Sequence, residues 1–213
     1  MNPLLIRRRG MMQSTSPILP PGYTLVPSVY GRRNGAKFVI IPTPYNSVEI
    51  YIEAKKTAFA SYTSYFGNYL SEGHNSIRLI SNTNDTGFFG NVNNKTDSPV
   101  QNLAGSVLDW HTFFLRRSGN DVLLTIDGIT ETRINAEDGT SNNGQVYLNA
   151  SSVSSNVSSE DTYFRRVIVS YNGVVYRDYY PCVNQSNVAG FYDVKRNVFE
   201  TSVNSNYPFH VGN

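Results

Sequence analysis

The sequence predicts an all-β protein built as an antiparallel sandwich. It holds 15 Tyr and 11 Phe in 213 residues, with 16% charged residues, and aromatic side chains suit the pleated surface of a sheet. Short apolar runs alternate with intervals rich in Asn, Ser, Thr and Gly, the spacing typical of a sandwich or jelly roll. No segment longer than the single turn possible at Ala54–Ala60 shows the 3.6-residue period of a helix.

Residues 1–20 are expected to form an extended N-terminal arm, followed by a single domain over residues 21–213. The arm is mixed apolar and basic, and it then contains three prolines between Ser14 and Pro21, which disfavour both helix and sheet. A disordered terminus is one interpretation. The other, which we prefer, is an anchoring arm that orders against a neighbouring subunit through Arg7, Arg8, Arg9, Met11 and Met12.

Nine strands are predicted after Tyr23. Val48, Ile50 and Ile52 alternate with Glu49, Tyr51 and Glu53, so one face of that strand is expected to point inward. Ser151–Ser159 has little apolar surface and is predicted to be an exposed loop. The nine candidates are Lys37–Ile41, Val48–Ala54, Ser76–Ser81, Thr86–Val92, Val107–Arg116, Val122–Ile126, Gly144–Asn149, Arg165–Tyr171 and Val174–Tyr179.

Two hairpins are specified by their connections. Asn172-Gly173 separates two runs of β-branched residues, which predicts a type I′ turn because both central positions then need positive φ. Ser118–Asp121 is a short link that fits only antiparallel neighbours.

Charge and cysteine content limit the partners. A net charge of +2 does not favour nucleic acid as a main partner. Cys182 is the single cysteine, so an intrachain disulfide is impossible, and the residue is expected to be a small buried hydrophobe. The basic N-terminus turns polar by Met12 to Ser14, so neither a signal peptide nor a membrane span is expected.

The acidic residues and histidines do not predict catalysis. Glu49 and Glu53 share a strand face, but at about 3.3 Å per residue they lie roughly 13 Å apart, too far for a retaining glycosidase. His74, His111 and His210 are scattered without metal or triad spacing, and His111 is expected to be structural.

Oxygen-rich turns do not predict a metal either. Asn82–Gly87 looks like a calcium loop but lacks its acidic density, so an ordinary Asn-rich turn is expected. Asp127, before Gly128, is expected to stabilise its own turn. The sequence therefore predicts no cofactor and no enzymatic activity.

An aromatic cluster leaves two interpretations open. The rings can pack the core or a subunit contact, since aromatics supply large buried area in either setting. They can also hold a sugar, with nearby polar residues supplying hydrogen bonds. The residues are Tyr62, Tyr65, Phe66 and Tyr69.

The segment from Tyr163 to Phe199 carries a resemblance to a known family. Its Arg-Asp-Tyr-Tyr-Pro-Cys run and the later Gly190–Asp193 turn resemble the closing part of concanavalin A-like, laminin-G-like jelly-roll domains of bacteriophage structural and bacterial surface proteins. Leu19–Thr24 is similar to the opening of such domains. Trp110–Arg116 with Leu124–Gly128 is similar to their central hairpin.

This resemblance implies a non-enzymatic bacteriophage virion component. Such a protein, made in the host cytoplasm, would be a capsid decoration protein, head fibre or tail appendage that docks by its arm onto other virion proteins, and it could be a homo-oligomer. The alternative is a carbohydrate-binding adhesion module of a phage or bacterial surface, with a surface glycan as its partner.

Overall fold

The computed structural model consists of strands and turns, without a helix in the part of the chain that it describes. Every strand pair is antiparallel, which confirms the predicted all-β class. The described residues are 16–32, 35–42, 47–60, 63–68, 77–81, 87–92, 100–118, 121–128, 130–135, 145–150 and 161–213.

The larger sheet has eleven strands in the order β1-β14-β15-β17-β2-β13-β4-β9-β10-β11, with β16 paired to β15. Strands from both ends of the chain meet in it, because β13 pairs with β2, β4 and β14. Its strands are β1 (Tyr23–Leu25), β2 (Ser28–Gly31), β4 (Val48–Lys56), β9 (His111–Ser118), β10 (Asp121–Ile126), β11 (Thr130–Asn135), β13 (Thr162–Tyr171), β14 (Val174–Asn184), β15 (Ala189–Asp193), β16 (Val198–Glu200) and β17 (Phe209–Gly212).

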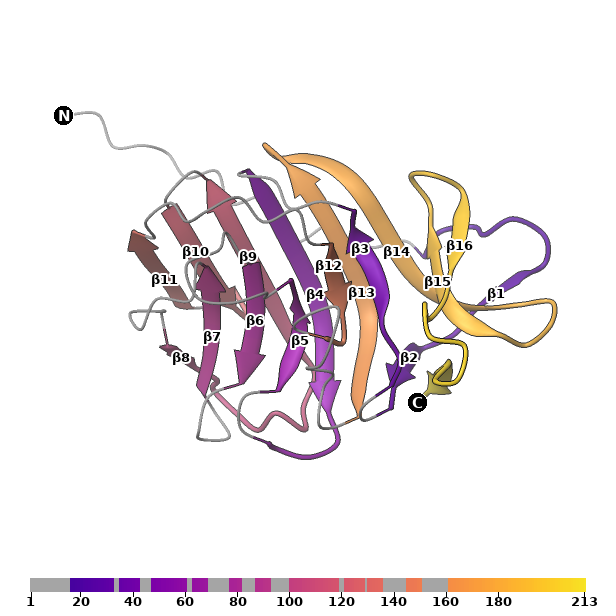
Figure 1. Ribbon diagram of the computed structural model, residues 1–213, viewed down its shortest axis with the longest axis horizontal. Helices are drawn as coiled ribbons and strands as arrows, with labels where there is room; N and C mark the ends of the chain where they lie inside the picture. Colours follow the sequence, from indigo (N-terminus) through magenta and orange to yellow (C-terminus); the bar gives the residue numbers. More distant parts are fainter. Residues whose placement is uncertain are drawn as a thin grey trace.

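The smaller sheet has six strands in the order β3-β12-β5-β6-β7-β8. It lies against one face of the larger sheet, and Figure 1 shows the two as layers. Its strands are β3 (Phe38–Ile41), β5 (Ser64–Gly67), β6 (Ile77–Ser81), β7 (Gly87–Val92), β8 (Val100–Asn102) and β12 (Val146–Leu148).

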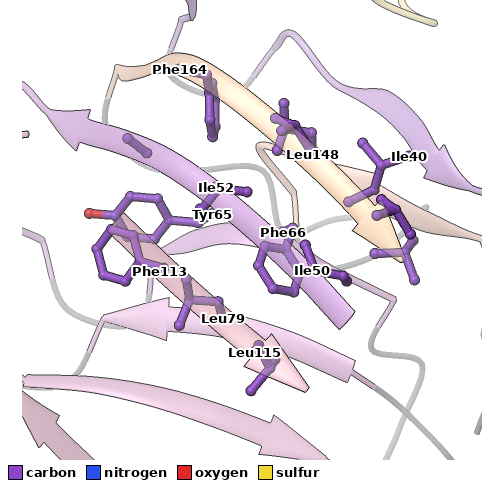
Figure 2. Packing of buried hydrophobic residues seen from close by; sticks show 14 of the residues in the cluster. Ile40, Ile50, Ile52, Tyr65, Phe66, Leu79, Phe113, Leu115, Leu148 and Phe164 are labelled. Carbon is purple, nitrogen blue, oxygen red and sulfur yellow. The ribbon is translucent and has the colours of Figure 1, made fainter. Parts of the chain in front are cut away.

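The core fills the space between the two layers (Figure 2). Ile50, Phe113 and Phe164 come from the larger sheet, and Tyr65 and Leu79 from the smaller one, all at most 1% exposed. The Tyr65 and Phe113 ring centroids lie 4.9 Å apart. Apolar burial of this kind contributes about 1.5–3 kcal/mol for each large side chain, so the sandwich is held by its core.

Strand β4 confirms the predicted alternation. Val48, Ile50, Ile52 and Ala54 are buried while the residues between them are half-buried. Lys56 continues the inward face, and its Nζ donates to Thr162 Oγ1 at 3.1 Å and lies 4.5 Å from the Tyr65 ring centroid.

The β13–β14 hairpin is also confirmed. Asn172 and Gly173 have φ of 48° and 77°, the positive values that a type I′ turn requires. A register shift between Val169 and Ser170 twists the hairpin just before its turn.

Some boundaries differ from the prediction. The segment from Val107 to Trp110 is a turn, and its strand begins at His111. Strand β14 runs on to Asn184 because β1 and β15 pair with its second half on opposite sides. Strand β5 was not predicted and arises from the aromatic cluster.

The closing segment is fixed by a buried carboxylate. Asp193 is fully buried, and its Oδ1 accepts the backbone N–H groups of Asp178 and Lys195. Its Oδ2 accepts Arg196 Nε at 2.7 Å. At Gly190 an added Cβ would collide with the Glu200 carbonyl oxygen, so glycine lets β16 approach β15.

Candidate functional site

The structure corrects half of the expected glycan-binding cluster. Tyr65 is 1% exposed and Phe66 0%, and both lie in the core between the sheets (Figure 2). Burial raises the pKa of Tyr65 strongly, so its hydroxyl stays neutral. Neither ring offers a surface to a sugar, and packing is the role that the structure gives them.

Several expected sites lie outside the described residues. They include the calcium-like turn at 82–86 and the loop at 151–159. Residues 1–15 of the expected anchoring arm also lie there, and the virion role and its partners stay predictions. The named side chains outside the described residues are Arg7, Arg8, Arg9, Met11, Met12, Tyr62 and Tyr69.

A row of large side chains crosses four strands of the larger sheet and ends just before a fifth, β9, on the face turned away from the core. Tyr163 in β13 pairs with Tyr30 in β2 on one side and with Lys55 in β4 on the other. His210 in β17 pairs with Tyr30. Ala54 pairs with His111, which places Trp110 beside Lys55. We call Trp110, Lys55, Tyr163, Tyr30 and His210 the aromatic row.

Strand alternation explains why these side chains share a face. Phe164 and Val29, which pair with each other next to Tyr163 and Tyr30, are fully buried. Residues one position away therefore point outward, and every member of the aromatic row is half-buried.

Three rings of the row are stacked. The Tyr30 and Tyr163 centroids lie 4.8 Å apart at an interplanar angle of 18°, and Tyr30 and His210 lie 5.2 Å apart at 28°. Neighbouring strands are about 4.8 Å apart, so near-parallel rings at this distance face one another. The edge of the Tyr163 ring also packs against Gly212 in β17, where an added Cβ would lie 2.6 Å from its Cδ1.

Two cations lie among these rings. Lys55 Nζ is 5.2 Å from the Trp110 centroid and 5.3 Å from that of Tyr163. The Arg165 guanidinium lies 3.8 Å from the Trp110 centroid and pairs with Glu53 at 3.3 Å. Arg165 reaches this position because it is the extra residue of a bulge in β13, between Phe164 and Arg166.

Burial and nearby charges favour the neutral forms of Tyr163 and His210. Burial raises the pKa of Tyr163, and Tyr30 and Asp161 raise it further. Burial also lowers the pKa of His210, with Arg32 acting in the same direction and Asp161 against it. Near neutral pH the site thus presents neutral hydrogen-bonding edges beside two cationic groups.

His111 lies beneath one end of the row. Its Nδ1 is 2.8 Å from Asp127 Oδ2, and its Nε2 is 2.8 Å from the Ser106 carbonyl oxygen. Asp127 Oδ1 accepts the backbone N–H of Thr112 at 2.8 Å. Asp127 therefore binds the neighbouring strand β9, and its expected role in its own turn stays a prediction.

The described residues contain neither a cluster of metal ligands nor a helix that could span a membrane. Nowhere among the described residues do three His, Cys, Asp or Glu side chains gather as a metal site requires. The described chain has no helix with the length and apolar character of a membrane span. Glu49 and Glu53 share the outward face of β4, as predicted, and Glu53 pairs with Arg165.

Sequence reasoning missed the aromatic row. Its members are separated by between 25 and 55 positions along the chain, so no local motif unites them. The available signal was weak, because Lys55 and Tyr163 lie just outside the predicted strands Val48–Ala54 and Arg165–Tyr171, and the observed strands include both residues. Their meeting depends on the strand order, which the sequence pattern does not determine.

Comparisons with known proteins concern the fold. No family model matches the chain, and no curated protein matches it. Domains LG4-5 of the mouse laminin α1 chain are 17% identical with a TM-score of 0.50, over 68% of this chain and 41% of that one.

Two further solved structures are similar at lower scores. A fructosyltransferase from A. japonicus is 14% identical with a TM-score of 0.47, over 71% of this chain and 26% of that one. Domain 4 of the arabinanase AbnA from Geobacillus stearothermophilus, in complex with arabinotriose, is 12% identical with a TM-score of 0.46, over 72% and 83%. At these identities the likeness describes architecture alone: the chain folds as a laminin-G-like β-sandwich.

Proposed function

We propose that this chain is a non-enzymatic glycan-binding module and that the glycan lies along the aromatic row. The observation that carries the proposal is the row itself. Its five residues form one line across four strands and the residue before β9; they are Trp110, Lys55, Tyr163, Tyr30 and His210. A line of half-buried aromatic and cationic side chains on an open sheet face is an unusual surface for a protein without a ligand.

The chemistry of the row suits a ligand that is rich in hydroxyl groups. The stacked rings of Tyr30 and Tyr163 carry hydroxyls, and these groups both donate and accept hydrogen bonds. Lys55 adds an ammonium donor that needs acceptor oxygens, and Arg165 adds the guanidinium N–H groups that Glu53 does not accept. A sugar chain supplies such oxygens at every residue, whereas an apolar peptide would leave these groups without partners, which is costly.

Matched tyrosine variants test this proposal on a glycan array. Replacing both Tyr30 and Tyr163 with Phe keeps the stacked rings and removes the two hydroxyls. We expect about tenfold weaker binding, the effect of losing one or two hydrogen bonds. Tyr176 is 37% exposed in the same sheet but packs against Tyr171 and Arg177, so Tyr176→Phe should bind as the unaltered chain does. A blank array with correctly folded protein would contradict the proposal.

A further inference from the structure

The His111 imidazole is a buried link between two segments of the chain. It is 7% exposed, and each ring nitrogen lies 2.8 Å from an oxygen: Asp127 Oδ2 at Nδ1 and the Ser106 carbonyl at Nε2. One partner belongs to the turn after β10 and the other to the segment before β9. The imidazole therefore ties these two segments together.

Both hydrogen-bond partners of His111, the Ser106 carbonyl oxygen and Asp127, act as acceptors. A backbone carbonyl can only accept, and the Ser106 oxygen also accepts the Asp109 N–H at 2.9 Å. Asp127 Oδ1 accepts the N–H and the hydroxyl of Thr112. Two acceptors need two N–H donors, and an imidazole has two only when it is protonated. If the proton sits on Asp127 instead, the pair still holds the same number of protons.

The same link controls the segment that carries Trp110. Ser106 and Asp109 close a turn, and Val107, inside that turn, is 1% exposed and accepts the Lys56 N–H at 2.9 Å. Trp110 leaves this turn directly before His111. With the Ser106 bond intact, the indole is held beside Lys55 and Arg165.

We infer that His111 and Asp127 are positioning residues for the aromatic row, and that their hydrogen bonds fix the place of Trp110. The inference rests on the proposed function, because it concerns the geometry of that same site. A side chain that cannot bond both acceptors breaks the link between the segment before β9 and the turn after β10. The Trp110 end of the row then loses one of its supports.

The charged groups around His111 come from three elements. Asp127 follows β10, and Asp109 belongs to the histidine's own segment, where a Cβ on Gly105 would lie within 4 Å of both side chains. On β4, Ala54 pairs with His111, and Lys56 is the next residue on that face. The ring of Phe113 is the aromatic neighbour, at 6.2 Å.

Trp110 is the single tryptophan of the chain, so its fluorescence reports this link directly. Emission of the full chain is compared at one pH for the unaltered protein and for His111→Gln, Asp127→Asn and His210→Gln. We expect a shifted emission maximum in His111→Gln and Asp127→Asn, because Trp110 leaves its place beside Lys55 and Arg165. His210→Gln should keep the emission of the unaltered protein.

Two further measurements keep the inference decidable. If the His111 variants do not fold, imidazole ¹⁵N spectra of the unaltered protein should show one buried histidine with both ring nitrogens hydrogen-bonded. Affinity for an array-identified glycan should be about tenfold lower in Asp127→Asn than in the unaltered protein, the size of effect that one lost charge-assisted hydrogen bond gives. Unchanged emission in folded His111→Gln and Asp127→Asn, or a buried histidine with one hydrogen-bonded nitrogen, would overturn the inference. Shifted emission in these variants without glycan binding by the unaltered protein would instead overturn the proposed function alone.

Discussion

At the scale of single residues, Asp193 shows how a polar group stabilises the closing segment. The carboxylate is fully buried, bonded to Arg196 at 2.7 Å and 3.5 Å from Arg177, which is itself buried. We expect Asp193→Asn to lower the free energy of unfolding by about 3–5 kcal/mol, because removing one partner leaves a buried charge uncompensated.

Glu53→Gln is the matched control in urea unfolding. It also removes a carboxylate from an arginine, but the Glu53–Arg165 pair is 29% and 40% exposed, and water screens such pairs. The expected change is below about 1 kcal/mol. Equal costs for the two substitutions would show that the Asp193 network does not stabilise the fold.

Cys182 gives a prediction about pH. Burial raises the pKa of its thiol from 9.0 to about 12, so between these values the folded chain keeps a proton that the unfolded chain releases. This contribution to stability is complete below about pH 9 and is lost as the pH rises toward 12. As the pH rises from about 9 to about 12, the free energy of unfolding of the unaltered protein should fall more steeply than that of Cys182→Ala. The difference in slope is up to about 1.4 kcal/mol per pH unit. If urea unfolding gave the same pH dependence of stability for the two proteins, the raised pKa of the Cys182 thiol would be contradicted.

At the scale of elements, the β13–β14 hairpin depends on its two-residue turn. Gly173 has φ of 77°, and a side chain in this region costs about 1–2 kcal/mol. Gly173→Ala should lower the free energy of unfolding by that amount. Asn172→Gly keeps a residue that tolerates positive φ and should change stability by no more than about 0.5 kcal/mol. Thermal unfolding compares the two, and equal losses would mean that the turn geometry is not what limits the hairpin.

The elements divide into those that the sequence predicts and those that depend on tertiary context. Strand β4 and the Asn172-Gly173 turn were predictable, because alternation and turn chemistry are local. Strand β5 is buried at all four positions, so it has no alternation to recognise. Trp110 looked like part of a strand, but the Ser106–Asp109 turn precedes it.

At the scale of the whole molecule, the sandwich was predictable and the site was not. The fold class follows from composition, spacing and the closing segment, and the structure confirms it. The aromatic row needs the pairing of β17, β2, β13, β4 and β9, strands brought together from the whole length of the chain. The sequence instead suggested the local cluster with Tyr65 and Phe66 as a candidate glycan site. Both rings are buried between the sheets and are therefore absent from the surface.

One face of the larger sheet packs against the smaller sheet, and the other face is turned away from the core. The packed face supplies stability, and the half-buried row on the other face supplies aromatic rings, hydroxyls and cations in one line. The central claim is therefore that ligand recognition belongs to this outward face.

Calorimetric titration of an array-identified glycan against two alanine variants tests that claim most directly. Tyr163→Ala removes the middle ring of the row, and Tyr176→Ala removes a comparably exposed tyrosine elsewhere on the same sheet. We predict a dissociation constant at least about tenfold higher for Tyr163→Ala, since truncating a central contact residue typically costs more than about 1 kcal/mol, and an unchanged constant for Tyr176→Ala. Equal affinities in two folded variants would contradict the account.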